Sequence, residues 1–127
     1  MTRVALVALG GAIGSVARYG VGALAAQLLG QAFPWGTLLV NLTGSFLIAL
    51  VMQVALSGSA LSLELRIFLT TGILGGFTTY SSFNYETLAL LHQRAHGLAS
   101  VNLAATVLGC LVAGLLGTAA GRGLAGA

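Results

Sequence analysis

The chain has 127 residues, of which 57% are hydrophobic and only 6% are charged, and its mean hydropathy is +1.02. This composition is too apolar for a water-soluble domain with an ordinary charged surface, so we expect an integral membrane protein. The charged side chains are five arginines and two glutamates, scattered along the chain. Because they form no basic cluster, the sequence argues against a nucleic-acid-binding protein.

Four apolar stretches are long enough to cross a bilayer as helices, which takes about 20 residues each. The stretches cover residues 3–29, 36–56, 65–91 and 98–121. The connections are short, and Pro34 stands where a second helix would begin, a position that suits proline. The first stretch runs past the length of a signal peptide's apolar part, so we expect a retained helix. We therefore predict an all-α membrane protein, with residues 1–127 forming a single four-helix transmembrane domain.

The arginines give a weak signal for orientation. With a cytoplasmic N-terminus, that side would carry Arg3, Arg66 and Arg122, and the other side Arg94 together with Arg18. Loops rich in positive charge normally face the cytoplasm, and three against two is a small bias. Two interpretations stay open: one fixed orientation, or insertion in both orientations with two opposed copies packed about a two-fold axis.

Small residues recur every four positions in the first and last stretches, a spacing that lets helix backbones approach closely. They are Gly10 and Gly14, Gly22 and Ala26, and then Gly109, Ala113, Gly117 and Gly121. The pattern predicts contact faces. It does not say whether the contacts lie within one chain or between two.

Polar residues form narrow stripes on three of the apolar stretches, at spacings that place them on one helix face. The stripes are Thr37, Asn41 and Ser45; Thr79, Ser82 and Glu86; and Asn102, Thr106 and Cys110. A polar group in hydrocarbon is costly unless satisfied, so the stripes suggest a thin wet path. The alternative is local bonding, in which hydroxyls bond their own helix carbonyls and asparagines join neighbouring helices.

The segment GGFTTYSS, residues 75–82, interrupts the third stretch near its middle. Gly75 and Gly76 are poor helix formers, and the hydroxyl residues after them compete for backbone hydrogen bonds. We therefore expect a broken helix there. A break at membrane depth is tolerated only inside protein or beside a cavity, and such breaks build ion sites. A glycine kink with no ligand is the alternative.

Three segments together resemble the signature stretches of the Fluc (CrcB) fluoride channels. They are GGAIGSVARYG, GTLLVNLTGS and GILGGFTTYSSF, in that order. The resemblance implies a dual-topology, antiparallel homodimer with two anion pores and a central structural sodium ion. Such a protein lies in a bacterial-type cytoplasmic (inner) membrane, crosses it several times, and exports fluoride passively, which gives fluoride resistance.

The resemblance also implies roles for individual residues. Main-chain oxygens of Gly75 and Thr78 would hold the sodium ion, contributed by both subunits. Asn41, Tyr80 and Phe83 would line the pore, with amide hydrogens and aromatic edges facing the anion. Tyr80 departs from the family pattern, which usually has phenylalanine at this position.

A polar track along the pore is the further implication of the family. It would contain Thr37, Ser81, Ser82, Glu86 and Thr106. An acid should repel fluoride, so Glu86 is either protonated or accepts hydrogen bonds from hydroxyls and orients them toward the ion.

Arg18 has two interpretations in this picture. It lies about 22 Å along a helix from Arg3, close to the far membrane surface. There it either attracts anions in an aqueous vestibule or anchors its helix by reaching into the interface.

The alternative transporter is a proton-coupled small multidrug-type exporter, which also has four short helices and dual topology. Such exporters depend on a glutamate in the first helix, and residues 3–29 contain no acid. A purely structural four-helix protein would leave the arrangement of Asn41, Tyr80 and Phe83 unexplained. The sequence has no arrangement of serine, histidine and acid typical of a hydrolase, and it has no phosphate-binding loop. We therefore do not expect an enzyme.

Overall fold

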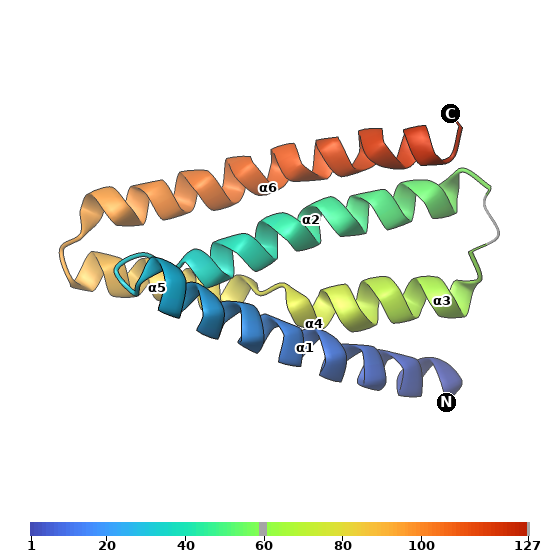
Figure 1. Ribbon diagram of the computed structural model, residues 1–127, viewed down its shortest axis with the longest axis horizontal. Coiled ribbons are helices and arrows are strands. Elements are labelled where there is room, and N and C mark those ends of the chain that lie inside the picture. The colour runs from blue at the N-terminus through green and yellow to red at the C-terminus, as the bar shows by residue number, and fades with distance from the viewer. Residues whose placement is uncertain (59–60, 127) are drawn as a thin grey trace.

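The computed structural model describes residues 1–58 and 61–126. In this part of the chain, helices make up four long rods (Figure 1). Three rods are single helices: α1 (Thr2–Leu29), α2 (Trp35–Leu56) and α6 (His96–Leu124). The remaining rod consists of α3 (Leu63–Ile67), η1 (Phe68–Leu74), α4 (Gly75–Phe77) and α5 (Tyr80–His92). The all-helical prediction is confirmed, and α6 runs past the predicted end at 121.

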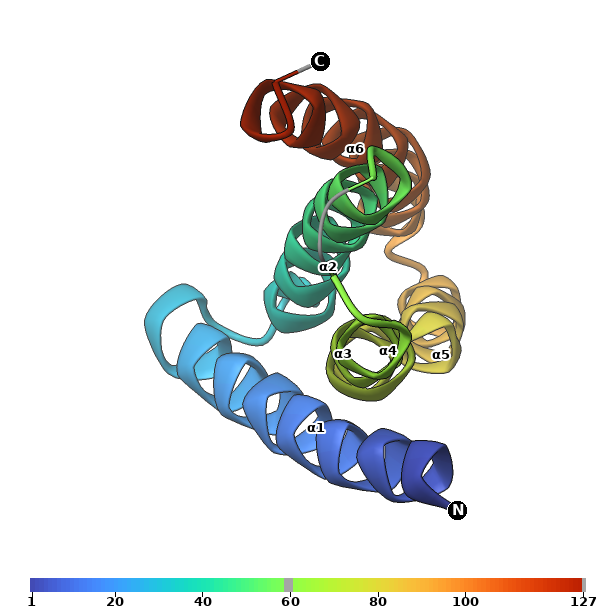
Figure 2. The same cartoon turned by 90° about the vertical axis from the view of Figure 1, so that its right-hand side faces the viewer.

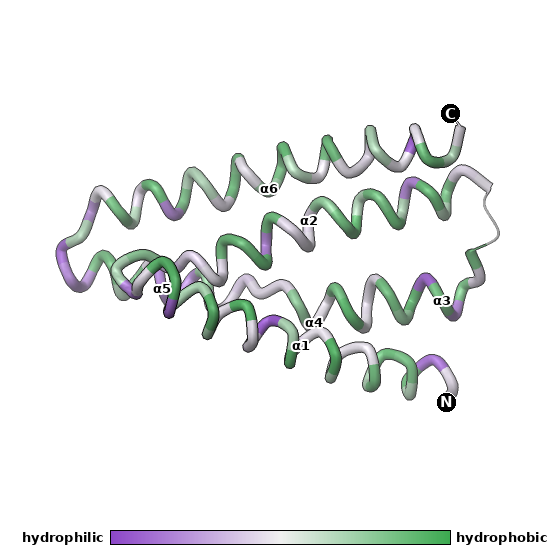
Figure 3. Tube along the Cα trace, viewed as in Figure 1, coloured by the Kyte–Doolittle hydropathy of each residue, from purple (hydrophilic) through white to green (hydrophobic). Residues whose placement is uncertain are grey.

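Helices α1, α2 and α6 are each long and apolar enough to cross a membrane. The third rod is not one of these continuous spans because its interruption divides it into shorter pieces. Figure 3 shows hydrophobic residues along all four rods and a hydrophilic turn between α5 and α6. The apolar surface therefore suits a bilayer over most of the molecule.

The rods pack in two main pairs, α2 along α6 and α1 against η1 and α4 (Figure 2). Glycines make both contacts possible. A β-carbon added at Gly14 would overlap the carbonyl oxygen of Ile73, and one added at Gly117 would overlap that of Phe46. At least these two small-residue positions therefore serve contacts within one chain, a question that the sequence left open.

The third rod is interrupted at Thr78 and Thr79, which are both extended, with φ/ψ of −92°/158° and −155°/122°. Its direction changes only slightly across this break (Figure 1), while an end-on view shows α5 displaced to one side of α3 and α4 (Figure 2). The predicted interruption is present, and the hydroxyls of Thr78 and Thr79 bond to nearby backbone as expected. The glycines, however, do not break the helix. Gly75 is helical, with φ/ψ of −61°/−39°, and helix continues to Phe77.

The second of the two glycines before the break, Gly76, serves close packing. A β-carbon at Gly76 would lie 2.6 Å from the carbonyl oxygen of Gly11 on α1. A larger residue would push α1 and α4 apart. The backbone leaves the helix two residues later, where side chains from other helices offer it alternative hydrogen bonds.

The seven residues of η1 form a π-helix, which the sequence did not predict. The N–H of Gly75 donates to the carbonyl of Thr70, five residues earlier, as well as to that of Gly72. Single π-turns inside α-helices are frequent near functional sites. Only the three residues of α4 separate this one from the break.

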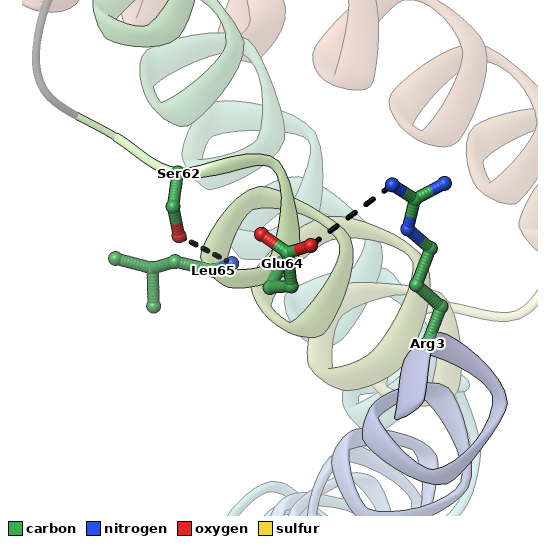
Figure 4. Close-up of polar contacts among 4 residues, drawn as sticks. All are labelled: Arg3, Ser62, Glu64 and Leu65. Carbon is green, nitrogen blue, oxygen red and sulfur yellow. Dashed lines mark hydrogen bonds and ion pairs between the residues drawn. The ribbon is translucent and has the colours of Figure 1, made fainter. Parts of the chain in front are cut away.

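Polar contacts at one end of the molecule join α1 to α3 (Figure 4). Arg3 and Glu64 form an exposed ion pair at 3.9 Å, and the Ser62 hydroxyl accepts a hydrogen bond from the N–H of Leu65 at 3.1 Å. An exposed pair of this kind contributes at most about 1 kcal/mol to stability. It brings the beginnings of the first and third rods together.

Candidate functional site

The break is held by a reciprocal pair of hydrogen bonds between Asn41 and Thr79. The Asn41 amide nitrogen donates to the Thr79 carbonyl at 3.0 Å, and the Thr79 N–H donates to the Asn41 amide oxygen at 2.9 Å. The side-chain amide thus replaces a peptide group as the partner of extended backbone. Asn41 is buried, and its amide nitrogen keeps one further N–H for another acceptor.

Hydroxyl groups gather where α5 begins. The Thr79 hydroxyl accepts from the N–H of Ser82 at 3.2 Å and so caps α5, and it donates to the Ser82 hydroxyl at 3.2 Å. The Ser81 hydroxyl lies 3.4 Å from the same oxygen. The N-terminus of α5 carries a partial positive charge, so these hydroxyls lie at a point that favours an anion.

Arg18 reaches the other side of the break. Its Nε donates to the carbonyl oxygen of Gly76 at 3.0 Å, across 58 positions of sequence. The predicted vestibule residue is therefore half-buried and bonded to backbone. It also lines a cavity of about 360 Å³ together with Thr37 and Thr79.

Thr37 and Glu86 form a short hydrogen bond between α2 and α5. The Thr37 hydroxyl donates to Glu86 Oε1 at 2.6 Å. Both residues line a cavity of about 340 Å³, which we call the outer cavity; its lining is Thr37, Ser81, Ser82, Tyr85 and Glu86. Four of the predicted track residues are thus brought together, and Tyr85 was not predicted.

The predicted aromatic pair is in contact. The rings of Tyr80 and Phe83 are 5.6 Å apart between centroids at 72°, an edge-to-face arrangement. Their exposures differ: Phe83 is 4% exposed and Tyr80 is 77% exposed. Within one chain, Phe83 is a core residue and Tyr80 faces outward.

A further cavity, of about 320 Å³, lies between α2, α5 and α6, and we call it the inner cavity. Its lining is Asn41, Ser45, Thr78, Thr79, Tyr80, Phe83, Thr106, Val107 and Cys110. The Thr106 hydroxyl is buried and has no hydrogen-bond partner within the described part of the chain. A buried hydroxyl without a partner is costly, which suggests a ligand or water beside it.

Two buried residues that were given no site role support Phe83. Asn102 donates to the Thr87 hydroxyl at 2.9 Å, and Thr87 donates to the carbonyl of Phe83 at 2.8 Å. Asn102 is only 1% exposed. A buried asparagine in an apolar helix is a signal for such a network, but its partner on another helix cannot be read from spacing.

The break also offers carbonyl oxygens to a cation. A helix that ends leaves its last carbonyls without intrahelical donors. Over residues 1–58 and 61–126, the carbonyls of Gly75 and Thr78 accept no hydrogen bond from a side chain or from another helix. Backbone carbonyls are ligands that hard cations accept, so these residues fit the sodium ion that the sequence resemblance implies.

Comparison with known proteins identifies the chain's relatives. The sequence matches the family described as CrcB-like protein, Camphor Resistance (CrcB), over residues 5–118. A protein of Anaeromyxobacter sp. (strain K) is 55% identical over 126 residues, 99% of this chain and 100% of that protein. One of Agrobacterium fabrum is 48% identical over 124 residues, 98% and 99% of the two chains. One of Thermus thermophilus is 63% identical over 91 residues, 72% of each chain.

These relatives are all named fluoride-specific ion channel FluC, which is the name of a channel and not of an enzyme. The apolar spans and the interrupted third rod define the class, a small multi-pass α-helical membrane protein. The chain belongs to the CrcB-like family, so the resemblance carried by its three sequence motifs is confirmed.

Proposed function

We propose that this protein is a fluoride-selective channel that lets fluoride leave the cell passively and so gives fluoride resistance. The observation that carries this is the inner cavity. Asn41 lines it with a spare N–H, Phe83 contributes an aromatic ring, and Thr106 contributes an unpartnered hydroxyl. These groups can surround a small dehydrated anion without a fixed positive charge that would bind it too tightly to conduct.

The outer cavity extends this path toward one membrane surface. The hydroxyls of Ser81 and Ser82 line it and also lie beside Thr79, which lines the inner cavity. Glu86 accepts a hydrogen bond from the Thr37 hydroxyl, so its carboxyl group orients that hydroxyl. A fluoride ion would pass between these hydroxyls and the inner cavity.

We further propose an antiparallel homodimer with two pores, and the exposure of the break supports a second copy. Gly75 and Tyr80 are exposed in a single chain, and Thr78 is half-buried beside them. Unpaired backbone groups cannot face lipid, so a second copy would cover this surface. The near-equal arginine distribution agrees with copies that insert in opposite orientations.

The second copy would also complete a cation site. Two carbonyls from each break, those of Gly75 and Thr78, would meet at the two-fold axis and form a four-oxygen cage for sodium. The C-terminal end of α4 carries a partial negative charge, which favours a cation there. When bound, sodium would join the two copies and offset the carbonyl dipoles.

The channel function is tested by ion efflux from liposomes. Purified protein is reconstituted in liposomes loaded with potassium fluoride or potassium chloride, and release is recorded with ion-selective electrodes after addition of valinomycin. We expect rapid fluoride release and negligible chloride release. Equal release of both ions, or no fluoride release from monodisperse protein, would contradict the proposal.

The assembly is tested separately by labelling. A Gln93→Cys variant in a Cys110→Ser background carries its one thiol in the turn between α5 and α6. With dual topology, an impermeant thiol reagent should label about half of the molecules from each side of the membrane. Labelling from one side alone would contradict the antiparallel arrangement.

A further inference from the structure

Arg18 connects the first rod to the break, and its bond has a specific geometry. The donor is Nε, and the acceptor is the Gly76 carbonyl in the last turn of α4. In an uninterrupted helix this carbonyl would accept from the N–H of Tyr80, four residues on. Because Thr78 and Thr79 are extended, the N–H of Tyr80 is carried away, and Arg18 takes its place.

The break is therefore supported from two sides by side chains of two different helices. Asn41 on α2 bonds both backbone groups of Thr79, and Arg18 on α1 bonds Gly76. Between these two contacts lie only Phe77 and Thr78. The carbonyl of Thr78 and that of Gly75, next to Gly76, stay available.

Arg18 forms no ion pair in the described part of the structure. The only ion pair among these residues joins Arg3 to Glu64, and no carboxylate lies within 4.0 Å of Arg18. The guanidinium instead lies at the C-terminal end of a helical segment, where a donor is favoured. The close packing of α1 on α4 at Gly76 holds the two helices near enough for this bond.

We infer that Arg18 is a positioning residue for the channel, acting through the Gly76 carbonyl and not through its charge on the anion. By bonding Gly76, it fixes the last turn of α4, beside the carbonyls of Gly75 and Thr78 that would hold a cation. It thereby also fixes the start of α5, which carries Tyr80 and Phe83. This inference rests on the proposed channel function.

Substitutions at Arg18 can separate the effect of its N–H donor from the effect of its positive charge. The Nε2 of glutamine is bonded to Cδ, as is the Nε of arginine, so Arg18→Gln keeps an N–H donor at the same place without the charge. Arg18→Met has similar length and neither donor nor charge, and Arg18→Lys keeps the charge. Arg122, exposed in the last turn of α6, gives a matched control, Arg122→Met.

Each variant is reconstituted for fluoride efflux, and its unfolding temperature in detergent is measured with sodium and with N-methyl-D-glucamine as the cation. We expect Arg18→Met to lower flux about tenfold or more, since it leaves the part-buried Gly76 carbonyl unpaired. We expect the same variant to reduce the stabilisation by sodium. Arg18→Gln should retain flux within about threefold and keep the sodium effect, as should Arg122→Met.

The remaining outcomes decide against the inference. If Arg18→Gln is as inactive as Arg18→Met while Arg18→Lys is active, charge is the important property. If Arg18→Met behaves as the parent protein, the bond has no role. Should Arg18→Met fail to fold, the comparison of Arg18→Gln with the parent still decides. If the parent protein itself shows no fluoride flux, the channel proposal fails, and the unfolding temperatures of the three Arg18 variants test the positioning role alone.

Discussion

Asn41 and Thr79 exchange two hydrogen bonds, of 3.0 and 2.9 Å, across 38 positions of sequence. The pair gives the buried asparagine two tasks at once. Its amide replaces the helical partners that Thr79 loses at the break, and its remaining N–H is available in the inner cavity. The structural support of the break and the proposed recognition of the anion thus depend on one side chain.

Asn41→Asp should abolish fluoride flux, by about 100-fold or more. The substitution removes both N–H donors and leaves an acceptor against the Thr79 carbonyl, with a negative charge or a lone hydroxyl in the inner cavity. Efflux from liposomes measures the loss, and size-exclusion chromatography checks assembly. Thr43→Val, on an exposed position of the same helix, is the control and should conduct as the parent does. Parent-like flux in Asn41→Asp would remove Asn41 from the pore.

The aromatic pair predicts unequal effects at its two positions. Phe83→Ile should lower flux about tenfold or more because it removes a buried aromatic edge from the inner cavity. Tyr80→Phe should conduct within about threefold of the parent, since the ring stays and no hydrogen bond of the hydroxyl is present among the described residues. Both are measured by fluoride efflux. The assignment is wrong if Phe83→Ile conducts normally, or if Tyr80→Phe is the more damaging change.

The sequence predicts the four rods because hydropathy and length alone determine where a membrane helix can form. It also locates the interruption to within a few residues. Of the two causes that it assigns, the glycines are wrong, since Gly75 remains helical and helix continues to Phe77. The other is present, since the hydroxyls of the extended residues Thr78 and Thr79 bond to nearby backbone. A further contribution is tertiary: the amide of Asn41 reaches Thr79 from another helix, which no local propensity contains.

In the candidate site, too, the sequence predicts some features and misses those that depend on packing. Spacing places Thr37, Ser82 and Glu86 on facing stripes, and the structure brings them to one cavity. The bond from Arg18 to Gly76 and the network from Asn102 to Phe83 depend on how helices pack. The π-helix of Phe68–Leu74 depends on a shift of one residue in hydrogen bonding. Neither composition nor spacing identifies the partners in these contacts or the π-helix.

Thr37→Val should lower fluoride flux about tenfold while leaving the protein folded. The change keeps the side-chain shape and removes the hydroxyl that donates to Glu86 at 2.6 Å, so the carboxyl group loses its partner in the outer cavity. Thr37→Ser retains the hydroxyl and should restore most of the flux. Efflux rates of the two variants are compared at equal protein density. If the valine and serine variants have equal flux, whether reduced or parent-like, the hydroxyl has no role.

Gly14→Ala tests the packing that places α1 against the third rod. An added β-carbon would overlap the carbonyl oxygen of Ile73, which belongs to backbone and cannot move without shifting η1. We expect a loss of about 1–3 kcal/mol in the free energy of unfolding, seen as a lower unfolding temperature in detergent. Because η1 continues through α4 to the break, fluoride flux should fall as well. Gly20→Ala adds the same methyl group on the same helix where nothing lies within 4 Å, so it should change neither property. Equal stability of the two variants would mean that α1 and η1 are not packed as closely in the membrane as in this structure.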